Sequence, residues 1–180
     1  MPVATEKSEY TEMNRSRKPY LLMFAAVVLF AGIAAAQSRS FNESGLEYTF
    51  EIPNEQWKLV SRTPYTNLVF GTAREGDLEI RKVTAPATKE IMDVMKEEEQ
   101  KLQFLQGFVA GKEENFSGAL KGSVYNYEFV RSGRPMAGRF YFLRSGDIIY
   151  VLRFTAYTNN LKSLRVQTDM MARTFQVKKA

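Results

Sequence analysis

Acidic side chains come first among residues that could do chemistry, because the 180-residue chain contains neither histidine nor cysteine. Ser-His-Asp and Cys-His nucleophilic sets, zinc sites of the usual ligands and haem held by histidine are therefore excluded. Paired carboxylates remain, and the candidates are Asp77 with Glu79, and Glu128. Glycosidase-type catalysis needs two carboxyl groups about 5–9.5 Å apart beside a cleft. Each candidate lies where an outward strand or turn residue is expected, so an envelope-polymer hydrolase is the alternative interpretation.

Two further motifs carry no catalytic prediction. Glu97, Glu98 and Glu99 are consecutive in an expected helix, where neighbours point in different directions, so they are predicted to be solvated charges and not a metal site. Ser117 and Lys121 lie four residues apart, which does not match the S-x-x-K spacing of a Ser-Lys pair. The sequence therefore predicts no metal and no cofactor, and no catalytic residue is assigned.

Basic side chains interleaved with tyrosines give the candidate partner-binding surface. Residues 37–120 contain ten Lys or Arg and fourteen Asp or Glu, whereas residues 121–180 contain eleven and three. A basic surface attracts acidic proteins, anionic lipid or polyanions, although outward-facing strand residues explain the same pattern. Arg and Tyr are also enriched at binding hot spots. The predicted surface comprises Arg131, Arg134, Arg139, Arg144, Arg153, Tyr125, Tyr127 and Tyr141.

An apolar run at residues 20–36 predicts where this surface works. Arg15, Arg17 and Lys18 precede the run, which ends in three alanines, and this order is typical of a secretory signal peptide cleaved after Ala36. The alternative is a retained membrane anchor with the same topology. Both place the rest of the chain outside the cytoplasm, where nucleic acid is not an expected partner. Three acids in the first twelve residues suggest that translation starts at Met13.

The segments that position the candidate residues read as strands and two helices. After a polar lead-in at residues 37–45, residues 46–52 alternate between apolar and polar, and a second strand begins at Trp57, which is expected in the core. Residues 66–72 and 78–83 predict a hairpin in which Gly76 supplies the permissive backbone. A helix is expected over residues 89–106, capped by Thr88, stopped by Gly107 and buried along Ile91, Val94, Met95, Leu102 and Leu105.

The second half predicts a meander and a closing helix. Residues 111–121 are expected to form a loop with a short edge strand at 115–119, before strands at 124–131, 137–144 and 148–157. A three-residue turn would pair Arg144 with Ile148, and Phe142 with Tyr150, which gathers the large apolar residues on one face. The last strand is apolar on both sides and is expected at the centre of the sheet. A helix over residues 161–174 is capped by residues 158–160, and its solvated side carries Lys162, Arg165 and Arg173.

These elements predict an α+β fold in which helices cover both faces of an antiparallel sheet of about six or seven strands. The opening YTFEIPNEQW and the ending YVLRFTAYTNNL, with a helix closing on RTFQV, resemble PsbP-like domains over residues 46–177. The resemblance implies a single-domain α-β-α sandwich and an adaptor or accessory role without a shared catalytic set. Metal-linked histidines proposed for photosynthetic members have no counterpart here. The leading expectation is an exported, non-catalytic module that docks on a protein partner.

Overall fold

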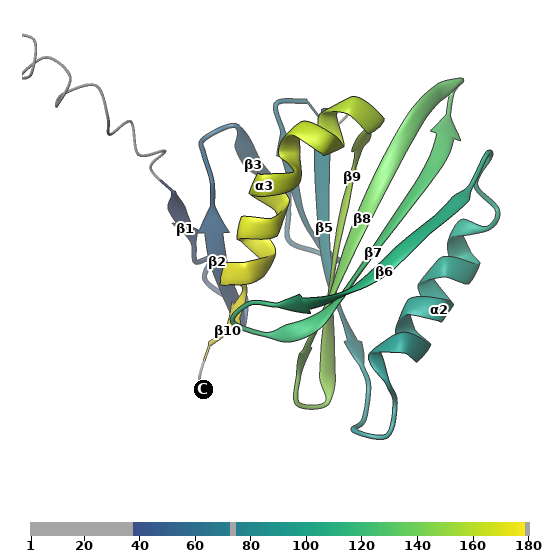
Figure 1. The fold of residues 1–180 in the computed structure, drawn as a ribbon. Coiled ribbons are helices and arrows are strands. Elements are labelled where there is room, and N and C mark those ends of the chain that lie inside the picture. The colour runs from purple at the N-terminus through teal and green to yellow at the C-terminus, as the bar shows by residue number, and fades with distance from the viewer. Residues whose placement is uncertain (1–37, 73–74, 179–180) are drawn as a thin grey trace, which may run out of the picture. The chain divides into compact units, whose positions relative to one another are not determined.

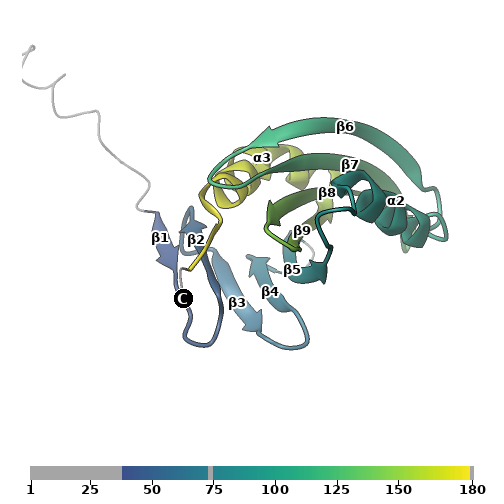
Figure 2. The same cartoon turned by 90° about the horizontal axis from the view of Figure 1, so that it is seen from below.

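A curved antiparallel sheet is the centre of the molecule. The computed structural model describes residues 38–72 and 75–178, which contain a seven-stranded sheet of order β3-β4-β5-β9-β8-β7-β6 and a helix on each of its faces (Figures 1 and 2). The α+β sandwich expected from the sequence is confirmed. The elements are β1 (Arg39–Phe41), β2 (Tyr48–Ile52), β3 (Trp57–Ser61), β4 (Thr66–Phe70), β5 (Gly76–Thr84), α2 (Ile91–Leu102), β6 (Val109–Ser117), β7 (Lys121–Arg131), β8 (Arg134–Ser145), β9 (Ile148–Tyr157), α3 (Thr158–Thr174) and β10 (Gln176–Val177).

Two apolar cores lie on opposite sides of the sheet, and we name its two sides the α2 face and the α3 face. Strand β9 is fourth of seven in the sheet and is buried on both sides, as predicted. Its Tyr150 and Leu152 pack in the α3-face core, whereas Ile149 and Val151 pack in the α2-face core. The lone Trp57 is 1% exposed, which confirms its place in the core.

The predicted pairing of β8 with β9 is wrong by one residue. Ile148 lies opposite Ser145, Phe142 lies opposite Val151, and only Gly146 and Asp147 form the turn. Phe142 therefore belongs to the α2-face core, whereas Tyr150 belongs to the α3-face core. Register is strongly specified by sequence only where a single face is buried. Both faces are buried here, so either register hides the apolar side chains, and the two-residue turn decides between them.

Helix α2 is shorter than predicted and has a different cap. It begins at Ile91 after Glu90, whose N–H donates to the Asp93 carboxylate at 3.1 Å, so Thr88 is not the cap. It ends at Leu102, and Gly107 lies beyond it with φ +63°. Val94, Met95 and Leu102 of the predicted apolar stripe are buried and Ile91 is half-buried, whereas Leu105 lies beyond the end of the helix.

Glu98 was expected in solvent and is instead buried beneath α2. It pairs with Arg81 of β5, and Lys101 Nζ lies 2.7 Å from its other oxygen. The basic residue that compensates it comes from a strand seventeen positions earlier in the chain. Local helical periodicity contains no information about such a partner, which is why Glu98 was predicted to be a solvated charge.

Helix α3 begins three residues earlier than predicted, because β9 continues into it without a loop. Tyr157 is the N-cap residue and Thr158 is already helical, so residues 158–160 form the first turn and not the cap. The apolar side of the helix is buried through Leu161, Leu164 and Met171, and the C-cap residue Phe175 is buried as well.

Strand β6 is a longer element than the loop and short strand predicted. Its nine residues form the edge of the sheet beside β7, and the pairing is interrupted by a bulge between Ala110 and Glu113. All of them except Phe116 are exposed, so neither side of the strand shows the alternation by which a half-buried strand is recognised.

Strand β2 does not join the seven-stranded sheet. It pairs with β1 and β10 in a separate three-stranded sheet, and its predicted apolar side packs in the α3-face core through Tyr48, Phe50 and Ile52. The β4–β5 hairpin is confirmed, but Gly76 is the first residue of β5 and the positive φ of +57° falls at Gly71.

The predicted signal peptide or anchor at residues 20–36 lies outside the described residues. Among the residues that are described, no helix is long and apolar enough to cross a bilayer.

Candidate functional site

A groove of about 440 Å³ lies between α3 and the β6–β8 end of the sheet. The N-terminal half of α3 forms one wall with Thr158, Leu161, Lys162 and Arg165. Strand β6 and the neighbouring part of β7 form the opposite wall, which includes Val109, Glu114 and Glu128. Asn126, Ala137 and Arg139 line the groove between the two walls. Its volume lies in the range of about 300–1,000 Å³ typical of ligand pockets.

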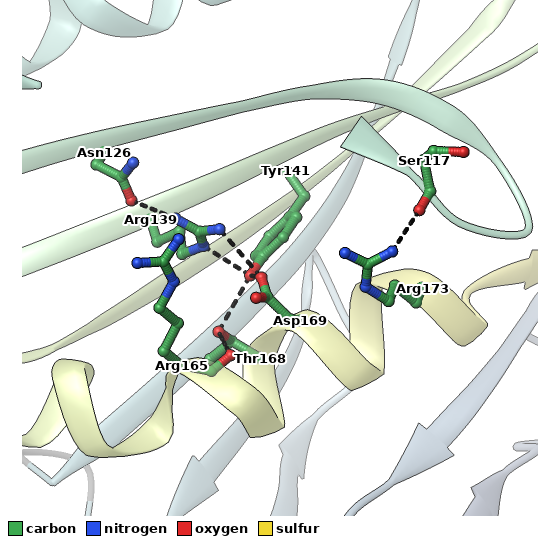
Figure 3. A network of polar contacts seen from close by, with 8 residues as sticks. All are labelled: Ser117, Asn126, Arg139, Tyr141, Arg165, Thr168, Asp169 and Arg173. Atoms are coloured by element: carbon green, nitrogen blue, oxygen red, sulfur yellow. Dashed lines mark hydrogen bonds and ion pairs between the residues drawn. The ribbon is translucent and has the colours of Figure 1, made fainter. Parts of the chain in front are cut away.

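A polar network centred on Arg139 fixes the floor of the groove (Figure 3). The Arg139 guanidinium donates to Tyr141 Oη at 2.7 Å, to Asn126 Oδ1 at 2.7 Å and to Asp169 Oδ1 at 3.0 Å. Tyr141 Oη in turn donates to Asp169 and lies 3.1 Å from Thr168 Oγ1. Asp169 and Thr168 belong to α3, so the network joins the helix to strands β7 and β8.

The network is held in one ionisation state. Burial opposes the charge of Arg139, but the Tyr141 hydroxyl and the Asp169 carboxylate outweigh it and raise the pKa of the guanidinium. Burial also raises the pKa of Tyr141, and the hydrogen bond to Asp169 adds to this, against the opposing effect of Arg139. Tyr141 therefore stays protonated, and neither group is poised to exchange a proton near neutral pH. The floor is suited to positioning and not to acid–base catalysis.

The two walls carry exposed charges of opposite sign. Lys162 and Arg165 project from α3, and Arg165 points toward Arg139 (Figure 3). Glu114 and Glu128 project from the facing strands. Within residues 38–72 and 75–178, none of these four side chains forms an ion pair within 4.0 Å. The groove thus has an acidic side and a basic side, and these charges are free to contact a ligand.

The eight predicted surface residues are not on one surface. Arg139 and Tyr141 lie on the α3 face, within the floor network. The other six lie on the opposite face, and there Tyr125 and Tyr127 are buried. The inward position of Arg139 could have been predicted from the sequence. Arg139 is two residues from the core residue Tyr141, so the two side chains lie on the same side of the strand.

Two of the remaining arginines hold the backbone or core in place. Arg144 donates to the carbonyl oxygens of Ala85, Lys89 and Gly146. Arg153 donates to Tyr127 Oη at 2.9 Å.

Arg131 and Arg134 are the exposed members of the predicted set. They flank the β7–β8 turn, and we call them the tip arginines. Arg131 lies over the Phe129 ring at 5.4 Å, and Arg134 lies over the Tyr157 ring at 5.7 Å. A pocket lined by Arg134, Tyr157 and Thr158 adjoins the groove, since Thr158 borders both. Arg134 therefore borders a pocket next to the groove, although both tip arginines project from the α2 face.

The candidate acids for hydrolysis are divided between two places. Asp77 and Glu79 are two residues apart on β5 and project from the same side of it, and burial, followed by the charge of Glu79, raises the pKa of Asp77. Glu79 lies 3.7 Å from Arg81, and neither Asp77 nor Glu79 lines the groove. Glu128 does line it, as does Glu114, which sequence reasoning missed. In the described part of the chain no group of three acids could hold a metal ion.

Comparisons with known proteins identify the fold. No family model matches the sequence, and no curated protein matches it. Among solved structures, cyanobacterial PsbP (CyanoP) from Synechocystis sp. PCC 6803 is 14% identical with a TM-score of 0.56, covering 82% of this chain and 95% of its own. The yeast Ran-binding protein Mog1p from Saccharomyces cerevisiae is 10% identical with a TM-score of 0.57, covering 79% and 96%.

A third structure, from Bacteroides thetaiotaomicron, is 14% identical with a TM-score of 0.57; the match covers 79% of this chain but 49% of that one. This chain therefore spans about half the length of the Bacteroides protein and nearly all of the other two. The fold is the one that cyanobacterial PsbP and Mog1p share, which confirms the fold implied by the resemblance to PsbP-like domains.

Proposed function

We propose that this protein is an exported, non-catalytic accessory module of the cell envelope or secreted space, which docks on a protein partner through the groove and the tip arginines. The observation that carries the proposal is the pair of oppositely charged walls, exposed and without ion pairs in the described chain, above a floor that the Arg139 network holds in place. A docking surface that is already ordered loses less conformational entropy when a partner binds.

Two further observations favour a protein as the occupant. Mog1p, which has the same fold, is described as a Ran-binding protein, so this fold is compatible with protein recognition. The groove also offers apolar contact beside its charges, because Val109 is 58% exposed on β6 and lines it. An interface core is usually apolar and surrounded by a polar rim. Anionic lipid or a polyanion would use the basic wall and the tip arginines but would be repelled by Glu114 and Glu128.

The hydrolase remains the second candidate function, and geometry disfavours it in the groove. Glu114 lies opposite Val124 in the sheet, four residues along β7 from Glu128, which is about 13 Å at the usual strand rise. Glycosidase carboxyl groups lie about 5–9.5 Å apart. Asp77 and Glu79 have a more suitable spacing and a raised Asp77 pKa, which is the observation in favour of a hydrolase. Release of reducing ends from envelope polymers, abolished by Asp77→Asn, would establish this function.

Site-specific photo-crosslinking tests the docking proposal. A photoreactive phenylalanine analogue replaces Val109 in the groove of the full chain, and, as matched control, Val60 on the opposite edge strand β3, where the side chain is 64% exposed. The proposal expects a defined protein adduct from position 109, in the envelope or secreted fraction of the native host, and none from position 60. Equal labelling at both positions, or no protein adduct at position 109, would overturn it.

The same preparation tests export. The proposal places the adduct outside the cytoplasm, with an N-terminal peptide that begins at Gln37 if the segment is cleaved or that retains residues 20–36 if it is an anchor. Mass spectrometry of the adduct distinguishes these two outcomes. An adduct found only in the cytoplasmic fraction would refute export.

A further inference from the structure

The charges of the groove form two pairs, which we call its rows: a basic row on α3 and an acidic row on β6 and β7. Lys162 and Arg165 are three residues apart on α3, so they are neighbours on the helix surface. Glu114 and Glu128 line the wall across from them. Any occupant therefore meets positive charge along one side and negative charge along the other.

None of these four charges forms an ion pair within the described residues, and direct contacts fix the position of α3 relative to the strands. At the floor, Asp169 of α3 accepts from Arg139 of β8 at 3.0 Å. At the far end of the helix, Arg173 Nη1 donates to the Ser117 carbonyl oxygen at 2.8 Å, and Ala119 N donates to the Arg173 carbonyl oxygen at 2.8 Å. These contacts fix α3 against β8 and against the β6–β7 turn. The spacing of the rows is thus set by the fold before a ligand arrives.

We infer that the groove takes an extended segment of the partner in which acidic and basic side chains alternate. Successive side chains of an extended chain point to opposite sides. Alternating charges would therefore put all acids toward Lys162 and Arg165, and all bases toward Glu114 and Glu128. The inference rests on the proposed docking function and specifies the chemistry of the docked segment.

Other charge patterns fit less well. An all-acidic segment meets Glu114 and Glu128, and an all-basic one meets Lys162, Arg165 and the floor arginine. A segment with its acids and bases in separate blocks places half of its charges against the wrong wall. Like charges brought together across an interface are unfavourable and exclude wrong partners. Alternation is the simplest pattern that satisfies both walls at once.

Two neutral peptides of equal composition test the inference. The probes are fluorescein-labelled, end-blocked octapeptides, one with Glu and Lys alternating four times and one with four Glu followed by four Lys. Binding to the full chain in non-ionic detergent is followed by fluorescence anisotropy. We expect the alternating peptide to bind at least tenfold more tightly than the block peptide. Equal affinities would overturn the inference, because composition and net charge are the same.

Charge-reversal variants show whether the groove is responsible. Lys162→Glu with Arg165→Glu should weaken binding of the alternating peptide at least tenfold, whereas the control Lys58→Glu, an exposed lysine on β3, should not. Adding Glu114→Lys and Glu128→Lys reverses both walls, and binding should recover, because the alternating peptide needs only to shift by one residue. Failure to recover, with the fold intact by circular dichroism, would overturn the inference.

The experiments distinguish failure of the alternating-segment inference from failure of the proposed docking function. If neither peptide binds but photo-crosslinking at position 109 still yields a defined protein adduct, the alternating-segment inference fails and the docking function stands. If position 109 yields no protein adduct either, both fail.

Discussion

The geometry of the groove depends on Arg139, because this residue fixes the position of α3 relative to the sheet. Arg139 is 6% exposed, and its charge is compensated by Asp169 from α3. A buried charge needs a partner of opposite charge, and removing that partner is costly. The pair therefore ties the position of α3 to the sheet, and with it the position of the basic wall.

Asp169→Asn tests this dependence. The substitution leaves the Arg139 guanidinium without its carboxylate and weakens the acceptor of the Tyr141 hydroxyl. Because Asp169 is 26% exposed, we expect a loss of about 2–3 kcal/mol in the free energy of unfolding, below the loss for a fully buried pair. Urea denaturation measures it. Arg165→Gln is the control and should change stability by less than about 0.5 kcal/mol; equal effects would contradict the role of the pair.

Asp77 gives a pH-dependent prediction. Burial raises its pKa above 3.8, the charge of Glu79 raises it further, and Arg153 and Arg131 act in the opposite direction. The folded state therefore binds the proton more tightly than the unfolded state, so stability falls as the pH rises above 3.8, and the full cost is reached above the folded pKa. Asp77→Asn removes this cost and should be more stable than the wild type at pH 7.

The difference between Asp77→Asn and the wild type should disappear as the pH falls below 3.8, where the carboxyl group is neutral in both states. Urea midpoints at pH 3 and pH 7 provide the measurement. Asp147→Asn, in the exposed β8–β9 turn, is the control and should change little at either pH. A wild type that is the more stable protein at pH 7 would contradict the prediction.

At the scale of elements, local sequence patterns were sufficient to locate most strands and both helices. The errors arose where a residue far away in the sequence determines the structure. The alternation of residues 46–52 and the apolar stripe of α2 were sufficient for those elements. Local patterns were not sufficient for the β8–β9 register, because both faces of β9 are buried and the length of the turn determines the pairing. The site was harder to predict, since Asp169 and Asn126 acquire their roles from Arg139 only after folding.

Glu98 is the clearest case of an element held by a distant partner, and it predicts how α2 is anchored. Its carboxylate pairs with Arg81 of β5 beneath the helix. Glu98→Gln would leave Arg81 without this charge partner, and we expect α2 to open more readily, by about 3 kcal/mol. Hydrogen exchange of the α2 amides measures this opening. Glu97→Gln, which removes a more exposed pair with Lys89, is the control and should have a small effect; comparable exchange in both variants would refute the anchoring role.

At the scale of the whole molecule, the acidic and basic halves of the sequence contribute opposite sides of the groove. Strand β6, from the acidic half of the chain, faces α3, from the basic half, across the groove. The tip arginines lie on the α2 face at the β7–β8 turn, where Arg134 borders a pocket that adjoins the groove. They are exposed and stack on Phe129 and Tyr157, so they are suited to attracting a partner before contact.

Reversing the tip arginines should therefore change the rate of association more than the rate of dissociation. Exposed charges at the rim of an interface mainly steer the encounter, and salt screens them within about 8–10 Å. For Arg131→Glu with Arg134→Glu, we expect partner association to slow about tenfold at low salt, and wild-type and variant rates to converge near 0.5 M salt. Surface plasmon resonance with the partner identified at position 109 measures both rates. Lys58→Glu should match the wild type, since it lies on β3 at the opposite edge of the sheet. A variant that dissociates faster but associates at the wild-type rate would instead place the tip arginines inside the contact, within the docked interface and not at its rim.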